Sequence, residues 1–115
     1  MNEQEYMSEV LRTYAGSHTP IDKLTLSALG LTSESGEVAN SIKQVIFQGH
    51  HLDTMHLIEE LGDILWYLVL ACIVLDCTLE DVMIVNVAKL RERYPNGFDP
   101  MRSINRPPKP QEGDH

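Results

Sequence analysis

The sequence has few basic residues, and this scarcity limits what the protein can bind. Its 115 residues include 9 Lys and Arg against 17 Asp and Glu, so the formal net charge is −8 at pH 7. A protein that binds DNA or RNA without sequence preference carries a basic patch that neutralises phosphates. The composition therefore argues against a nucleic-acid polymer as partner, and an anionic ligand would need a metal ion to mediate its binding.

Cysteine, a leader segment and long apolar runs are also scarce or absent. The two cysteines, Cys72 and Cys77, are five residues apart within one predicted helix, so they do not share a face and we expect no disulfide. No basic segment followed by an apolar stretch begins the chain, so no secretory signal is expected. The longest apolar run, residues 64–75, is shorter than the roughly 18 residues that span a bilayer. We therefore expect a cytoplasmic protein that makes no membrane contact.

Strand signals are missing as well. Between residues 1 and 94 no alternating apolar pattern and no hairpin dipeptide occurs, whereas apolar residues recur with helical spacing. The first helix ends near Gly16, Pro20 is expected to act as a breaker in the following loop, and Asp53-Thr54 and Thr78 are candidate N-caps. The periodicity predicts an all-α, four-helix bundle-like protomer with helices at residues 2–15, 24–48, 54–76 and 78–94.

The chain is short enough to form one domain, which we place at residues 1–98. From residue 99 onward the composition changes, and the segment NRPPKPQEGDH is polar and rich in proline. Proline removes a backbone donor and obstructs a helix interior. We therefore expect residues 99–115 to form an extended or disordered tail.

The third predicted helix is apolar on every side between residues 64 and 75. A helix that is apolar all round must be buried all round, and three other helices of one short chain can hardly surround it. The pattern therefore predicts a homo-oligomer, either a dimer or a dimer of dimers, whose interface uses this helix.

The same helix begins with an acidic segment, IEELGD, at residues 58–63. At about 100° per residue, Glu60 and Asp63 lie on one flank and can direct two carboxylates toward one point. His56 is placed to act as a supporting partner of Glu60. Glu59 and Trp66 point nearly opposite, and we assign Trp66 to packing. The flank comprises His56, Glu60, Asp63 and Tyr67. It borders a predicted inward apolar arc of Leu57, Ile58, Leu61, Ile64, Leu65 and Leu68.

The second predicted helix repeats the arrangement in the segment ESGE. Glu34 falls inside its apolar arc and Glu37 lies at the edge; the arc comprises Leu31, Ser35, Val38, Ile42 and Val45. Four carboxylates that converge from two helices repel one another unless a divalent cation binds them. Ligation by oxygen alone favours Mg²⁺ or Mn²⁺ over zinc. The alternative is that these acids form a solvated face or interact with helix dipoles.

The fourth predicted helix carries basic residues. Asn86, Lys89 and Arg93 share a face, and Tyr94 lies beside them. In an acidic chain this stripe is suited to receive phosphates. The alternative is that the basic residues only complement the C-terminal dipole of the helix.

These segments together resemble a known family. The sequence ESGE, then ELGD, then NVAKLRERYPNGF is similar to the MazG-like, all-α nucleoside triphosphate pyrophosphohydrolases, whose hallmark is ExxE followed by ExxD. The similarity covers about residues 24 to 98 and is strongest with the small single-domain members of bacteria and phages.

The resemblance implies a function for each motif. Glu34, Glu37, Glu60 and Asp63 would hold Mg²⁺, with Glu37 or Glu34 also activating the attacking water. The reaction would cleave a nucleoside triphosphate between its α and β phosphates, in nucleotide pool control or house-cleaning. The substrate would be bound, in this view, by Asn86, Lys89, Arg93 and Tyr94, with contributions from Tyr67 and Gln44.

Several of these roles have alternatives. Tyr67 is placed to bond a phosphate or the sugar, but it is equally suited to be a core tyrosine. Gln44 continues the face of Glu37 and Ser41 and is a candidate for recognising a base edge. In the family the first helix often closes over the nucleotide, and here it offers Tyr6 and Tyr14 for stacking.

Three rival functions fit parts of the pattern. A phosphoribosyl-ATP pyrophosphohydrolase uses similar helices and metal chemistry. A di-iron carboxylate bundle also directs glutamates inward, but it requires Glu-x-x-His pairs, and neither Glu34 nor Glu60 has a histidine three residues later. A non-enzymatic helical oligomer would leave all the acids solvated.

Overall fold

The computed structural model of the chain describes residues 1–107 and is helical, with no β-strand in that part. This confirms the all-α fold class. The predicted tail at residues 108–115 lies outside the described residues. The helices of the described part are α1 (Glu3–Thr13), α2 (Pro20–Phe47), α3 (Thr54–Val74), α4 (Leu79–Arg93) and α5 (Pro100–Ile104).

The chain divides into two compact units, of which the first is Met1–Leu79 and the second begins at Glu80. The first unit holds α1, α2 and α3, whereas α5 and nearly all of α4 belong to the second. The first unit therefore contains three helices, and the predicted four-helix bundle-like packing of the protomer stays a prediction.

Helix α2 begins earlier than predicted. Thr19 is its N-cap, with the side-chain oxygen accepting a hydrogen bond from the backbone N–H of Asp22 at 3.3 Å, and Pro20 occupies the first turn. Proline is well tolerated there because the first N–H groups of a helix have no partner inside it, and its fixed φ suits a helix. The expectation that Pro20 breaks the chain in a loop is wrong.

Helix α3 begins as predicted and ends two residues earlier. The Asp53 side chain accepts from the N–H of His56 at 3.1 Å and so caps the first turn. At the other end Asp76 adopts a left-handed conformation with φ of 55°. The N–H of Cys77 donates to the carbonyl of Cys72 at 3.0 Å, and the N–H of Asp76 donates to that of Ile73 at 3.2 Å. These two bonds define a Schellman motif, which satisfies the last carbonyls of a helix.

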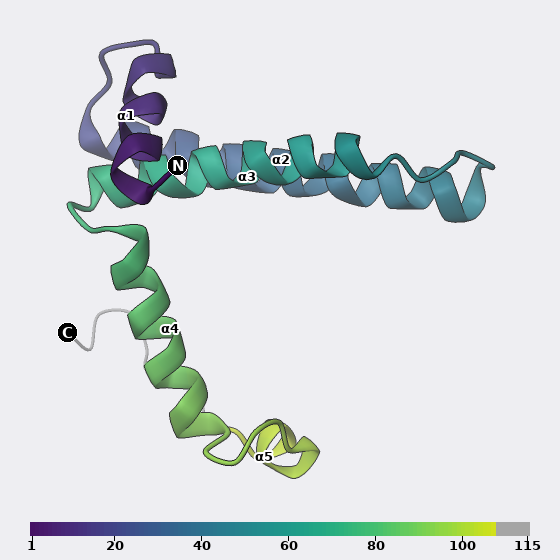
Figure 1. The fold of residues 1–115 in the computed structure, drawn as a ribbon. Helices are drawn as coiled ribbons and strands as arrows, with labels where there is room; N and C mark the ends of the chain where they lie inside the picture. The colour runs from purple at the N-terminus through teal and green to yellow at the C-terminus, as the bar shows by residue number, and fades with distance from the viewer. Residues whose placement is uncertain (108–115) are drawn as a thin grey trace. The chain divides into compact units, whose positions relative to one another are not determined.

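Helices α2 and α3 lie side by side and run in opposite directions (Figure 1). On each helix a series of buried and half-buried positions is spaced at alternating steps of three and four residues, as at the seam of a coiled coil; from residue 64 to residue 74 the other positions of α3 are covered as well. On α2 this seam contains Ser27, Leu31, Glu34, Val38, Ser41 and Val45. On α3 it contains Leu57, Glu60, Ile64, Tyr67 and Ala71.

The predicted inward arcs are therefore partly wrong. Ser35 and Ile42 of α2 are exposed, as are Ile58 and Leu61 of α3. A single partner helix covers only a narrow seam, whereas the projections assumed the broad buried stripe of a helix in a larger core. Of the acidic flank of α3, Glu60 and Tyr67 lie in the seam instead, whereas His56 and Asp63 are exposed.

The core of the first unit lies where α1 packs on α3. Val10, Val69 and Leu70 are fully buried, and Tyr6, Leu26 and Trp66 are among the half-buried residues that pack against them. The indole N–H of Trp66 donates to Thr13 Oγ1 at 2.8 Å, which ties α3 to the end of α1. The assignment of Trp66 to packing is confirmed. Within residues 1–107, none of the helices combines the length and the apolar character that crossing a membrane requires.

Part of the predicted tail is a helix. Asp99 caps α5 by accepting from the N–H of Met101 at 2.9 Å, and Pro100 occupies the first turn. The prediction of extended chain from residue 99 is thus wrong for Pro100–Ile104, for the same reason as at Thr19 and Pro20: a polar cap followed by proline starts a helix.

Candidate functional site

Glu60 is the buried charged side chain of the candidate site. Only 7% of its surface is exposed. The Ser41 hydroxyl of α2 lies 2.9 Å from Oε1 and 3.2 Å from Oε2 of this carboxylate. His56 Nε2, one turn earlier on α3, lies 2.7 Å from Oε1. The predicted pairing of His56 with Glu60 is confirmed, and Ser41 is a partner that the sequence analysis did not identify.

These contacts explain why Glu60 can occupy the seam. A buried carboxylate is costly unless hydrogen bonds replace its lost water. Ser41 supplies one bond across the seam, and the spacing of four residues places His56 directly above Glu60 on the same helix. The side chain of Glu60 is thereby held in one position between α2 and α3.

Asp63 is exposed one turn after Glu60 and lies near α1. Burial, and next the negative charge of Asp63, raise the pKa of the Tyr6 hydroxyl above its ordinary value. Of Tyr6 and Tyr14, Tyr6 is therefore the one beside the acidic flank. Tyr14 instead places its hydroxyl 2.5 Å from Nδ1 of His18 and its ring beneath the ammonium of Lys23.

Tyr67 packs tightly in the seam. Its ring lies so close to Gly30 of α2 that a Cβ on this glycine would come within 2.3 Å of it, and Trp66 makes an edge contact with it at a centroid distance of 5.0 Å. A side chain at position 30 would thus push the helices apart. The structure brings Tyr67 into packing contacts, and its predicted contact with substrate stays a prediction.

The remaining acids lie on α2. Glu34 is half-buried in the seam, Glu37 is exposed, and Gln44 is half-buried one turn after Ser41. Within residues 1–107 no group of three or more His, Cys, Asp and Glu side chains is close enough to hold a metal ion. The donors are nevertheless all carboxylate oxygens, which suits Mg²⁺. Glu37 and Asp63 are exposed, so they can change rotamer at little cost.

The second unit carries the predicted phosphate-binding residues. Asn86 and Lys89 are exposed on α4, whereas Arg93 and Tyr94 at its end are half-buried. The ring of Tyr94 lies 5.3 Å from that of Phe98, which follows the turn at Pro95–Gly97.

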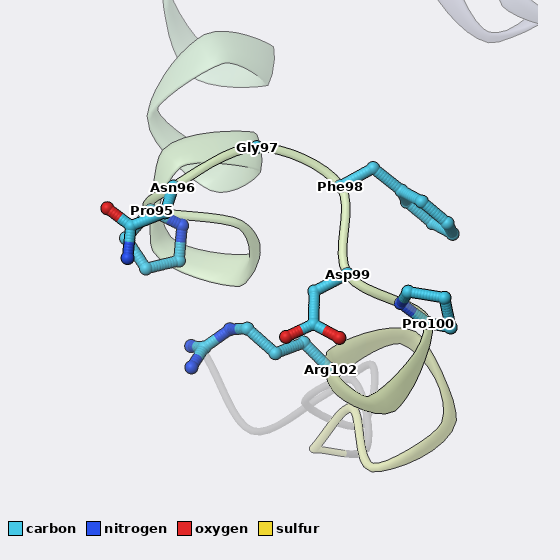
Figure 2. Close-up of a pocket in the computed structure, with 7 residues that line it drawn as sticks. All are labelled: Pro95, Asn96, Gly97, Phe98, Asp99, Pro100 and Arg102. Carbon is cyan, nitrogen blue, oxygen red and sulfur yellow. The ribbon is translucent and has the colours of Figure 1, made fainter.

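Arg102 of α5 closes the C-terminal end of α4. Its Nε donates to the carbonyl of Arg93 at 2.6 Å, and Nη2 donates to that of Glu92 at 3.4 Å. These are carbonyls that the helix itself leaves without a partner. A hollow of about 390 Å³ beside this contact is lined by residues 95–100 and by Arg102. Figure 2 shows Asp99 and Arg102 on one side of the turn and Phe98 turned away from them. The guanidinium serves as a helix cap here.

Comparison with known proteins identifies the family. Residues 23–98 match the MazG nucleotide pyrophosphohydrolase domain. The chain belongs to this family. It is also 33% identical over 87 residues to the Gene 37 protein of Mycobacterium phage L5, a match that covers 72% of this chain and 76% of the phage protein. No solved structure shows a significant match.

Membership in the MazG family confirms the resemblance on which the motif assignments depend. The matched segment contains both acidic motifs, ESGE and ELGD, and the basic end of α4. Because this is a family of nucleotide pyrophosphohydrolases, membership in it supports the prediction that the protein is a hydrolase.

Proposed function

We propose that this protein hydrolyses nucleoside triphosphates or their deoxy forms between the α and β phosphates, giving a nucleoside monophosphate and pyrophosphate. The observation that carries the proposal is the family match over residues 23–98, which includes every acid in the two motifs. A second support is Glu60, a buried carboxylate held between two helices by Ser41 and His56. Fixed charged groups of this kind are typical of a site that must not rearrange during a reaction.

Mg²⁺ is the proposed cofactor, with Mn²⁺ as a substitute, and its ligands would be Glu34, Glu37, Glu60 and Asp63. When bound, the metal would neutralise phosphate charge and lower the pKa of a coordinated water. Glu60 is already oriented by its two partners. Glu37 or Glu34 would orient the attacking water and accept its proton.

Lys89 and Arg93 are proposed to bind the β and γ phosphates and to stabilise charge on the departing pyrophosphate. Asn86 and Tyr94 would assist them through neutral hydrogen bonds. Gln44 is proposed to recognise a base edge. Tyr6, which lies beside Asp63, is better placed than Tyr14 to contact a nucleotide. The proposed role is nucleotide pool control or house-cleaning.

The test is a panel of canonical and modified nucleotides with excess Mg²⁺, in which monophosphate and pyrophosphate are measured separately. Phosphoribosyl-ATP belongs in the panel, because its hydrolysis alone would favour the sibling activity. Glu37→Gln and Asp63→Asn should each lower kcat by at least about a hundredfold. Hydrolysis that is unaffected by both substitutions would contradict the proposed site.

We also propose that the protein is a homo-oligomer, a dimer or a dimer of dimers. The premise that one chain cannot surround residues 64–75 is wrong, because residues 64–74 are buried or half-buried within this chain. The support is instead the number of large apolar side chains that the first unit leaves exposed. They include Leu29, Ile46, Phe47, Leu52, Met55, Ile58 and Leu61, each at least half exposed. Light scattering after size-exclusion chromatography at micromolar concentration should give at least twice the chain mass of 13.0 kDa. A monomer would contradict the proposal.

A further inference from the structure

The Schellman motif that ends α3 brings the two cysteines together. In this motif the side chain three residues before the C-cap residue contacts the side chain two residues after it. Cys72 and Cys77 occupy these positions, since the N–H of Cys77 bonds the carbonyl of Cys72 at 3.0 Å. The influence of Cys77 on the pKa of the Cys72 thiol agrees with this proximity. The spacing argument that kept them apart assumed a helix continuing through both residues, and that assumption is wrong because α3 ends at Val74.

The two thiols are not equivalent. Cys72 is buried with 3% of its surface exposed, whereas Cys77 is half-buried. Burial, followed by the charge and the hydrogen bond of Cys77, raises the pKa of the Cys72 thiol to about 11. The thiolate is the attacking form in disulfide exchange, and a raised pKa leaves little thiolate at the buried Cys72. We therefore expect Cys77 to react first with an external disulfide and Cys72 to attack in the second step.

We propose that Cys72 and Cys77 form a dithiol exchange site that reacts with small-molecule disulfides to give an intramolecular disulfide. The Cys77 thiolate attacks the small disulfide, forms a mixed disulfide and expels one thiolate. Cys72 then attacks the Cys77 sulfur, losing its proton to the solvent, and expels the second thiolate. In sum, two protein thiols and one small disulfide give one protein disulfide and two small thiols. The disulfide would link Cys72 to Cys77 across the turn that contains Asp76, and it would fix the C-terminal end of α3.

The test treats the full-length reduced protein with glutathione disulfide at pH 8.5 and follows the intact mass and the disulfide-linked peptides. Wild type should lose two hydrogens, yield a Cys72–Cys77 linkage and melt at a higher temperature than the reduced form. The Cys72→Ser variant should stop at a stable glutathione adduct on Cys77. The Cys77→Ser variant should keep Cys72 as a free thiol under the same conditions.

Two results would overturn the proposal. One is a wild-type protein that accumulates the glutathione adduct on Cys77 as the Cys72→Ser variant does, because Cys72 then cannot reach its neighbour. The other is a wild-type protein that keeps both thiols while denatured protein, treated identically, loses them. Reduction with dithiothreitol should restore the original mass and melting temperature, which separates exchange from irreversible oxidation.

Discussion

At the scale of single residues, Ser41 is expected to stabilise the buried carboxylate of the candidate site. It bonds the buried Glu60 carboxylate across the seam at 2.9 Å. Removing a hydrogen bond from a buried charged group costs about 1.5–3 kcal/mol. We therefore expect Ser41→Ala to lower the free energy of unfolding by about this amount in urea titrations.

A matched control is Ser35→Ala, because Ser35 is an exposed serine on the same helix. Alanine is the better helix former, so this substitution should be neutral or slightly stabilising. Equal effects at the two positions would show that the Ser41 bond to Glu60 contributes nothing. A second measurement, Mn²⁺ binding followed by electron paramagnetic resonance, should show weaker binding in Ser41→Ala alone.

Gly30 and Gly36 form a second matched pair at this scale. A Cβ at position 30 would meet the Tyr67 ring at 2.3 Å, whereas a Cβ at position 36 would meet nothing within 4 Å. Forcing an extra carbon into a packed seam costs about 1–3 kcal/mol. Gly36→Ala should instead stabilise by about 0.4–1 kcal/mol, because it restricts the unfolded chain. The melting temperature should therefore fall in Gly30→Ala and rise in Gly36→Ala. Shifts of the same sign would contradict the packing of Tyr67 on Gly30.

At the scale of elements, the end of α4 depends on a side chain that lies beyond the segment matched to the family. Arg102 bonds the carbonyls of Arg93 and Glu92. Losing these bonds should cost the last turn of α4 about 1 kcal/mol of local stability. We expect Arg102→Ala to speed amide hydrogen exchange about fivefold in that turn and to leave α3 unchanged.

Arg106→Ala is the control for this substitution, since Arg106 is an exposed arginine after α5. If the two variants exchange alike, the guanidinium of Arg102 does not cap α4 in solution. If exchange rises in Arg102→Ala alone, residues beyond the family match help to hold Arg93 and Tyr94 in place.

The elements also show what the sequence could predict. The helical period located α1, α2, α3 and α4, because such patterns persist along a helix whatever it packs against. Helix starts at Pro20 and Pro100 were missed because proline both breaks helix interiors and favours first turns. The capping oxygens of Thr19 and Asp99, directly before each proline, are the signal that separates the two cases.

Contacts between elements were harder to predict. The pairing of His56 with Glu60 follows from a spacing of four residues on one helix. Ser41 lies 19 residues from Glu60, and its contact depends on the register of α2 against α3, which no spacing within one helix determines. The contact of Cys72 with Cys77 likewise depends on where α3 ends and on the left-handed residue Asp76.

At the scale of the whole molecule, the family match and the helix packing involve the same acidic residues. The family match covers both motifs, and the fold places Glu34 and Glu60 in the seam of two antiparallel helices. In the proposed mechanism water attacks the α-phosphorus and pyrophosphate is the leaving group.

The most direct test is hydrolysis of the preferred nucleotide in water enriched in ¹⁸O, followed by mass spectrometry of both products. Attack at the α-phosphorus places the ¹⁸O in the nucleoside monophosphate and leaves pyrophosphate unlabelled, which is the result we predict. Label in pyrophosphate would show attack at the β-phosphorus and contradict the proposed mechanism. Release of orthophosphate in place of pyrophosphate would contradict cleavage between the α and β phosphates altogether.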